Sequence, residues 1–520
     1  MKKPMRLSFY ILIILLTACS HPCQVIDTFD DPRVILQGFY WESYRYGHTD
    51  QFPEIYPGYP NVDKYWYQIV QDKAPEIREG RFDMIWLPPP CESGGAGYSP
   101  TEFFNPNNMY GDSAIQRSML EALWGSGVEP LADIVLNHRN GSESWAGFRN
   151  PAWNTKSICR SDEAFSNPNS EVYNTPDSLR GAEEELVPYD NSRLRAYAYE
   201  SFRDIDQTNL LVKEDILKYL LFLKSMGYRG WRYDMVHGYH AKHVAEYNRY
   251  TCPTFSVGEY DWDKHDAMRG WIWNTSLDTT KLGDDRLRTS SAVFDFSTYF
   301  TLMNSIGIGC NGNANYIALY GFNNGLGMMG DDTDGLSWKN RAVTFLENHD
   351  TGWRTNEDGT NQEHHDFDSF SNNWQVEQGY AYILTHPGIP CVFWKHYFDW
   401  GQELQDKIKA LINARKVAGV NSGSALHTQH NARDAGVYAA MVQGTKGQLY
   451  VRIGGEDAQW EPSKSGYGNY MEYAYGNGWK VWVTLNDSSV NAAFQFNPLN
   501  DALTPIPAPV KISDIKLTIE

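Results

Sequence analysis

Short apolar runs rich in β-forming residues alternate with helical patterns along most of the chain. Such runs, bounded by turn residues, are typical of strands buried in a parallel sheet. We predict eight strands, at Val34–Trp41, Phe82–Leu87, Glu129–Asn137, Gly230–Met235, Phe255–Tyr260, Val293–Phe296, Ala342–Glu347 and Pro390–Trp394.

Helical periodicity separates several of these strands. Apolar residues recur at steps of three and four, which predicts helices at Ile115–Trp124, Leu210–Met226, Ala241–Tyr250 and Gln402–Val417. Strands that alternate with helices form a parallel sheet joined by crossovers. With eight strands in 520 residues, we predict an α/β fold built on a TIM (β/α)₈ barrel over residues 34–418.

Two stretches break the alternation. The segment from Arg139 to Arg203 is rich in Asn, Ser, Pro and Glu, and it predicts an inserted B domain at residues 139–205, after the third strand. Beyond Gly419 the helical pattern stops, and alternating runs such as Gly447–Ile453 predict an antiparallel β domain at residues 419–520.

The first residues have the pattern of an export signal. Lys2, Lys3 and Arg6 precede a short apolar stretch, so we expect a signal peptide at residues 1–18 and a linker at 19–33. Small residues precede Cys19, as in the bacterial lipobox, which predicts a lipid anchor on this cysteine and attachment to a bacterial membrane. The alternative is an ordinary signal peptide with an incidental cysteine.

The composition indicates a globular protein that binds a neutral partner. Hydrophobic residues make up 42% of the chain, which is enough for a large core, and the net charge of −19 argues against a nucleic-acid partner. Aromatic residues reach 14%, and their flat rings can pack against sugars, although most are expected in the core. We expect a monomer that binds a polysaccharide.

Six cysteines remain after Cys19, and none of them form a CxxC pair. Their spacing therefore disfavours a zinc or redox site. Export permits disulfides, but the sequence does not determine the pairing, and some of the six are candidates for buried thiols.

Polar side chains end four of the predicted strands, where barrel enzymes build their sites. A charge inside a strand is costly unless it is paired, so these charges need a reason. The four segments are Asp133–His138, Gly230–Asp234, Val257–Tyr260 and Phe345–Asp350.

Cleavage of a glycosidic bond is a chemistry that needs such a set. It requires an acid to protonate the leaving oxygen and a carboxylate to capture the oxocarbenium-like centre. Asp234 and Glu259 end consecutive strands, so their carboxyl groups can approach the separation of about 5–5.5 Å found in retaining enzymes. Arg232 points to the same face of its strand as Asp234 and is expected to keep that carboxylate ionised.

Together the four motifs resemble those of the α-amylase family of retaining glycoside hydrolases, over residues 34–417. Several details are similar to the plant and archaeal branch of that family. They are Gly-Trp-Arg-Tyr-Asp-Met-Val-His-Gly-Tyr from Gly230, Val-Gly-Glu-Tyr from Val257, Val-Phe-Asp-Phe from Val293 and Asn-His-Asp-Thr from Asn348.

The resemblance implies roles for three carboxylates. Asp234 corresponds to the nucleophile that forms a glucosyl-enzyme, and Glu259 to the general acid and base. Asp350 corresponds to the third carboxylate, which grips the sugar hydroxyls and favours the distorted ring. We therefore expect these three side chains to converge at the mouth of the barrel.

The resemblance also implies substrate-binding residues beside Arg232. His138 and His349 match the histidines that bond the glucose unit next to the scissile bond, and Tyr98 matches a tyrosine that stacks under it. A core or loop position is the alternative for Tyr98. His237 replaces a lysine found in many family members, which puts binding on the leaving-group side in doubt.

A structural Ca²⁺ between the B domain and the barrel is a further implication. Calcium prefers carboxylate, amide and carbonyl oxygens. By the family pattern its ligands are Asn137, Asp206 and the carbonyl of Gly238, with Asp190 as a fourth candidate. The alternative for Asp206 is the N-cap of the helix that begins at Leu210.

These implications favour an endo-acting α-amylase that hydrolyses α-1,4-glucosidic bonds with net retention. A transglycosylase or a maltooligosaccharide-specific hydrolase would use the same carboxylates. A non-catalytic lipoprotein that captures glycans is the alternative outside the enzymes, although such a protein would be expected to lose one of the three acids.

Overall fold

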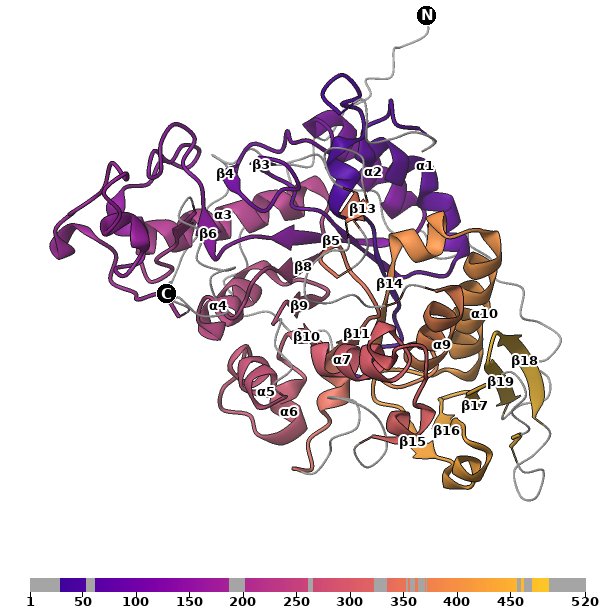
Figure 1. Cartoon of the computed structure of the whole chain (residues 1–520). Coiled ribbons are helices and arrows are strands. Elements are labelled where there is room, and N and C mark those ends of the chain that lie inside the picture. Colours follow the sequence, from indigo (N-terminus) through magenta and orange to yellow (C-terminus); the bar gives the residue numbers. More distant parts are fainter. Residues whose placement is uncertain are drawn as a thin grey trace, which may run out of the picture.

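Eight parallel strands close into a barrel in the computed structural model, in the order β1-β14-β11-β10-β9-β8-β5-β2 (Figure 1). They are β1 (Ile35–Gln37), β2 (Met84–Leu87), β5 (Glu129–Ile134), β8 (Gly230–Tyr233), β9 (Ser256–Gly258), β10 (Ala292–Phe294), β11 (Ala342–Thr344) and β14 (Ile389–Phe393). Each overlaps one of the predicted strands, and the predicted barrel is confirmed.

The structure describes residues 29–52, 61–186, 202–260, 265–321, 334–351, 354–355, 361–362, 370, 372–455, 460–462 and 470–485. The predicted signal peptide and the candidates Cys19 and Asp190 lie outside these residues. Within them, no helix is long and apolar enough to cross a bilayer.

Several strands end earlier than predicted, because the chain turns off toward the rim of the barrel. β1 stops at Gln37, and at the next residue the backbone passes so close to β2 that a Cβ on Gly38 would lie 2.6 Å from Ile85. The 3₁₀ helix η1 (Trp41–Arg45) then lies where the strand was expected to continue.

Helices cover the outside of the barrel (Figure 1). The four predicted helices appear as α2, α3, α4 and α10, and five others accompany them in the described chain. The set is α1 (Trp66–Glu79), α2 (Ser113–Gly125), α3 (Leu210–Met226), α4 (Ala241–Thr251), α5 (His265–Asn274), α6 (Gly283–Leu287), α7 (Phe296–Ser305), α9 (Asn373–Ile383) and α10 (Gln402–Ala418).

The segment after β5 projects to one side of the barrel, where Figure 1 shows it in purple. Its two ends are joined by antiparallel pairing of β6 (His138–Arg139) with β7 (Arg203–Asp204). Between them the described chain forms mainly loops and short 3₁₀ turns. A hairpin of β3 (Glu92–Ser93) and β4 (Pro100–Glu102) also rises after β2.

The C-terminal part forms a five-stranded antiparallel sheet, as predicted, with one face packed on α9 and α10. Its order is β15-β16-β17-β19-β18, with bounds Ala425–Thr428, Tyr438–Gln443, Gly447–Ile453, Trp479–Leu485 and Met471–Gly476. The barrel, its helices and this face of the sheet share one hydrophobic core. The loops that follow the barrel strands are thus supported by one continuous hydrophobic core.

Candidate active site

The three predicted carboxylates follow barrel strands at the same end of the barrel. Asp234 comes directly after β8, Glu259 after the neighbouring β9, and Asp350 after the turn that ends β11. Side chains at the carboxyl ends of barrel strands face a common mouth. The barrel therefore brings these three residues to one site.

Arg232 ties two of these carboxylates together from within β8. Its Nη1 donates to Asp234 Oδ1 at 2.6 Å and to Asp133 Oδ1 at 2.8 Å, and its Nη2 lies 2.8 Å from Glu259 Oε1. The guanidinium is fully buried and also lies over the ring of Trp86. One cation is therefore shared by three carboxylates, two of them the proposed catalytic pair.

Arg232 favours the ionised form of the Asp234 carboxyl group, and burial of that group opposes it. Burial raises the pKa of Asp234 to about 7, although Arg232 lowers it, and the charge of Asp133 adds to the rise. Burial likewise raises the pKa of Asp133 to about 6. A guanidinium divided among three anions compensates each of them only in part.

The backbone after Asp234 is turned toward Glu259. Met235 has a left-handed φ of 47°, which is uncommon for a residue with a side chain, and its N–H donates to Glu259 Oε2 at 3.3 Å. Backbone hydrogen bonds also tie Glu259 to Tyr233 and Val236. Unusual backbone of this kind is concentrated at functional sites.

Asp350 lies at the open side of the site, with 47% of its side chain exposed. Its Oδ2 is 3.2 Å from Nε2 of the buried His349. The His349 ring stacks on Tyr98 at 5.1 Å and 11°, and Tyr98 is in turn parallel to Trp41 at 5.9 Å. The Tyr98 hydroxyl donates to Asp133 at 2.8 Å, so contacts link Asp350 to the Arg232 cluster.

The half-buried Tyr98 ring packs against the core and also lies beside the rings of His349 and Trp41, which are 6.1 Å from each other. His138 contacts the backbone of Tyr98, since its Nε2 lies 2.8 Å from the Tyr98 carbonyl oxygen. Burial lowers the pKa of His138 to about 4, so this ring is neutral at neutral pH. His237 is also buried, with its ring 6.0 Å from that of Tyr260.

Several residues of the site were not singled out from the sequence. Asp133 accepts from Trp86 Nε1 at 3.0 Å in addition to Arg232 and Tyr98, and Gln37 contacts His349 from β1. A signal was present for two of them, because Asp133 and Gln37 are polar residues inside apolar strand sequences. Trp41 and Trp86 gave no signal that separates them from core aromatics.

The predicted calcium ligands are only partly brought together. Asn137 lies beside Gly238, since a Cβ on that glycine would be 1.9 Å from Asn137 Oδ1. The acid that contacts Asn137 is Asp204, whose Oδ1 accepts from Asn137 Nδ2 at 2.7 Å. The carboxylate of Asp206 accepts from Thr208 and Ala182 instead.

The N-cap alternative for Asp206 was wrong, because Asn209 caps α3 by accepting from Leu211 N at 3.0 Å. Asp206 forms a turn before the helix, in which its side chain accepts from Thr208 N at 2.9 Å. Its second oxygen accepts from Ala182 N at 2.6 Å and ties the insertion to this turn.

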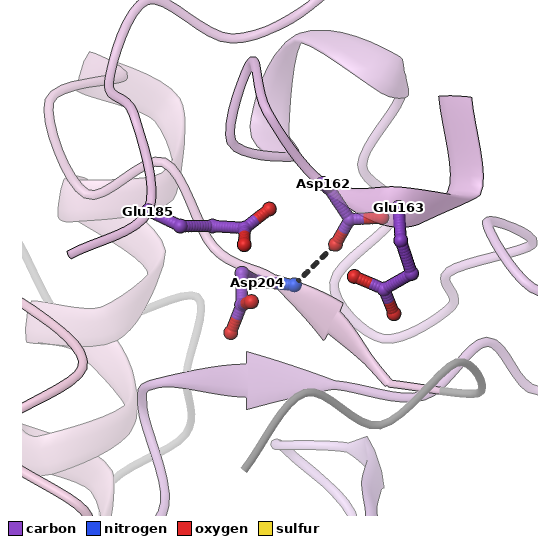
Figure 2. Close-up of side chains that lie close together, drawn as sticks. All are labelled: Asp162, Glu163, Glu185 and Asp204. Atoms are coloured by element: carbon purple, nitrogen blue, oxygen red, sulfur yellow. Dashed lines mark hydrogen bonds between the residues drawn. The ribbon is translucent and has the colours of Figure 1, made fainter. Parts of the chain in front are cut away.

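Four acidic side chains from the segment between β5 and α3 lie close together (Figure 2). They are Asp162, Glu163, Glu185 and Asp204, and one oxygen from each lies within 4.8 Å of the others. Burial raises the pKa of Glu185 to about 8, and burial together with the neighbouring acids raises that of Asp204 well above its ordinary value.

Arg203 is a cation within contact distance of this acidic cluster, with Nη1 2.6 Å from Asp162 and Nη2 3.5 Å from Glu163. One guanidinium offsets only part of the charge of four carboxylates. Several hard oxygen donors in a small space are the ligands that Ca²⁺ takes. The cluster fits a calcium ion, with Asn137 beside it through Asp204.

Comparisons with known proteins agree with this architecture. Residues 417–483 match the family model of the alpha-amylase C-terminal beta-sheet domain. The chain is 31% identical over 442 residues to probable alpha-amylase 2 of Arabidopsis thaliana, covering 84% of this chain and 90% of that protein. It is 29% identical over 482 residues to a glucan 1,4-alpha-maltotetraohydrolase of Roseateles saccharophilus, covering 88% and 73%.

Solved structures share the fold at lower sequence identity. An alpha-amylase from Geobacillus thermoleovorans, in complex with acarbose, has a TM-score of 0.55 at 14% identity, over 88% of this chain and 99% of that one. A gamma-CGTase from alkalophilic Bacillus clarkii has a TM-score of 0.62 at 14% identity, over 88% and 71%.

Proposed function

The chain belongs to the α-amylase family, and on this premise we propose that it hydrolyses α-1,4-glucosidic bonds within starch-like glucans, with net retention at the anomeric carbon. The observation that carries the proposal is the sharing of one buried guanidinium by Asp234 and Glu259. Two carboxyl groups in one small site are what a double displacement requires.

In the first step, Glu259 donates its proton to the leaving glycosidic oxygen while a carboxylate oxygen of Asp234 bonds to the anomeric carbon. In the second step, Glu259 takes a proton from water, whose oxygen bonds to that carbon and releases Asp234. Only the ionised form of Asp234 attacks. Asp350 lies at the solvent side, where its carboxylate can accept from sugar hydroxyls.

A time course of products on amylose tests the activity, and the anomeric form of the first product tests retention. We expect α-anomeric oligosaccharides of mixed length early in the reaction. Glu259→Gln should lower turnover by about three orders of magnitude or more while polymer binding stays detectable, because protonation and deprotonation of oxygens are lost.

Glu121→Gln, an exposed residue of a surface ion pair, serves as the control and should leave turnover unchanged. Full activity of Glu259→Gln would remove this residue from the mechanism. Starch binding without hydrolysis by the unaltered protein would favour the non-catalytic glycan-binding alternative.

A second candidate function is hydrolysis that releases one short oligosaccharide, since two relatives are named glucan 1,4-alpha-maltotetraohydrolases. A single dominant short product from the start of the reaction would support a maltooligosaccharide-forming enzyme. New products of greater length in the presence of an added sugar acceptor would support a transglycosylase, which uses the same carboxylates.

A bound calcium ion is part of the proposal. Asp162, Glu185 and Asp204 would hold it, with Asn137 beside them, and the ion would offset the charge that Arg203 leaves uncompensated. Its role would be structural, because the cluster of Figure 2 includes Asp204, which contacts Asn137 just after barrel strand β5. A chelator should then lower the melting temperature, since the ion binds the folded state.

The two neighbouring acids provide a matched test. Asp204→Asn should reduce the effect of the chelator, whereas Asp206→Asn should destabilise the turn and leave that effect in place. Equal melting temperatures of the unaltered protein with and without chelator would argue against the ion.

We further propose that the protein is exported and anchored through lipid on Cys19. The basic and apolar pattern of residues 1–18 supports this. Labelling with a radioactive fatty acid should mark the unaltered protein and leave Cys19→Ser unlabelled. Label retained in that variant would contradict the anchor.

A further inference from the structure

Gln37 is a fully buried amide at the end of β1, in the mouth of the barrel. Its Nε2 lies 3.0 Å from Nδ1 of His349, which follows β11. In the barrel, β14 lies between β1 and β11. The amide therefore reaches across one strand to contact a ring of the candidate active site.

Aromatic side chains surround the His349 ring. Tyr98 stacks on it at 5.1 Å, Phe39 lies at 5.1 Å and 42°, and Trp86 meets it edge-on at 5.4 Å. The two ring nitrogens have polar neighbours on different sides, which are Gln37 at Nδ1 and Asp350 at Nε2. These rings restrain the plane of the imidazole, so its nitrogens keep their partners.

We propose that Gln37 is a positioning residue that keeps His349 as the neutral tautomer with its proton on Nε2. An amide nitrogen only donates, so Nδ1 must accept and carries no proton. The Nε2–H then faces the Asp350 carboxylate and the proposed sugar site. Its consequence for catalysis rests on the proposed function, whereas the tautomer itself does not.

The opposite arrangement is disfavoured by Asp350. If the Gln37 amide were turned over, its oxygen would accept from an Nδ1–H, and the neutral ring would present a lone pair to a carboxylate oxygen 3.2 Å away. A second proton on the ring, or a proton on the Asp350 carboxyl group, would be needed to relieve that repulsion. The state of the two nitrogens therefore distinguishes the proposal from both alternatives.

Long-range ¹H–¹⁵N spectra of protein labelled at histidine measure this state directly. The signal of His349 is the one that disappears in His349→Gln. We expect an unprotonated Nδ1 and a protonated Nε2 at neutral pH. A protonated Nδ1, with or without a proton on Nε2, would overturn the proposal, and this result does not depend on whether starch is cleaved.

Two substitutions test the consequence. Gln37→Leu removes the donor at Nδ1, so the Nδ1–H tautomer, then disfavoured by Asp350 alone, should gain population, and kcat should fall roughly ten- to hundredfold with a smaller change in KM. Gln37→Glu places an acceptor against Nδ1, so the ring should take a second proton and lose it as the pH rises. Its activity should therefore fall on the alkaline side of the profile, at a pH where the unaltered enzyme stays active.

Gln116→Leu is the matched control, because it removes an equally buried amide that donates to Tyr67 and to the Pro90 carbonyl from α2. It should lower the melting temperature while the His349 signals and the pH profile stay unchanged. Unchanged tautomer, kcat and pH profile in both Gln37 variants would show that Gln37 does not position His349.

Discussion

At the scale of single residues, Arg232 influences the charge state of the three carboxyl groups that contact it. Asp133, Asp234 and Glu259 all contact this guanidinium, and burial raises the pKa of Asp234 to about 7. A nucleophile must be ionised to attack. The kcat/KM of the enzyme should therefore fall as the pH drops below about 7.

Asp133→Asn tests this at the residue that competes for the same cation. The charge of Asp133 raises the pKa of Asp234, so its removal should lower that pKa and move the acid limb of kcat/KM to lower pH. The asparagine oxygen can still accept from Trp86 or Tyr98. Kinetics on a soluble maltooligosaccharide across the acid range measure the shift.

Asp215→Asn is the control, because this buried carboxylate contacts Trp153 and Lys218 and lies on α3. Its acid limb should match that of the unaltered enzyme. If the acid limb of the kcat/KM profile of Asp133→Asn stayed at the same pH or moved to higher pH, Asp133 would not raise the pKa of Asp234.

At the scale of elements, a buried pair connects the turn after β11 to the turn after β14. Glu347 Oε2 lies 3.0 Å from Nε2 of His396, and its Oε1 accepts from Phe370 N at 2.9 Å. His396 lies in the π-helix η9 (Lys395–Asp399), and its Nδ1 is 2.9 Å from the Tyr380 hydroxyl of α9. Glu347 thus supports the segment that carries Asp350.

Glu347→Ala should therefore destabilise the fold by about 1–3 kcal/mol, because it leaves the buried N–H of Phe370 without its acceptor. Glu347→Gln keeps a carbonyl oxygen and should cost less. Urea unfolding measures both. Glu403→Gln is the control, because it breaks only a surface ion pair with Lys407, and the free energy of unfolding should change by less than about 1 kcal/mol. An equal loss of stability in Glu347→Ala and in this control would show that Glu347 does not support the segment that carries Asp350.

The same scale shows where the sequence was informative. The eight strands of the barrel were all predicted, because buried parallel strands are continuous apolar runs. α9 was not predicted, since its residues from Gln375 to Ile383 are buried on every side and leave no polar face to give a period. α1 was hidden by Pro75, which the helix contains.

The candidate site follows the same division. Asp234, Glu259 and Asp350 could be found because each follows a recognisable strand end. Asp204 and Asp206 could not be told apart, since they are two residues apart and only the pairing of β7 with β6 places Asp204 beside Asn137. Contacts that depend on three-dimensional register, such as that of Gln37, leave no pattern in the chain.

At the scale of the whole molecule, His386 connects the barrel to the C-terminal sheet. It follows α9, its Nδ1 lies 2.7 Å from the Tyr382 carbonyl, and its Nε2 lies 2.6 Å from the Tyr438 hydroxyl of β16. Arg415 of α10 donates to the His386 carbonyl at 2.6 Å. Burial lowers the pKa of His386 to about 3.

His386 should make the stability of the protein sensitive to acid. In the unfolded chain His386 takes up a proton below about pH 6.5, whereas in the folded chain it does so only near pH 3. The free energy of unfolding should therefore decrease as the pH falls between these values, by up to about 1.4 kcal/mol per pH unit. His386→Gln should be less stable at neutral pH but should lose stability less steeply on acidification. Urea unfolding over this range measures the slope, and His427→Gln, an exposed residue of β15, should keep the original slope. If the free energy of unfolding changed equally with pH in the unaltered protein and in His386→Gln, protonation of His386 would not be a cause of the acid sensitivity.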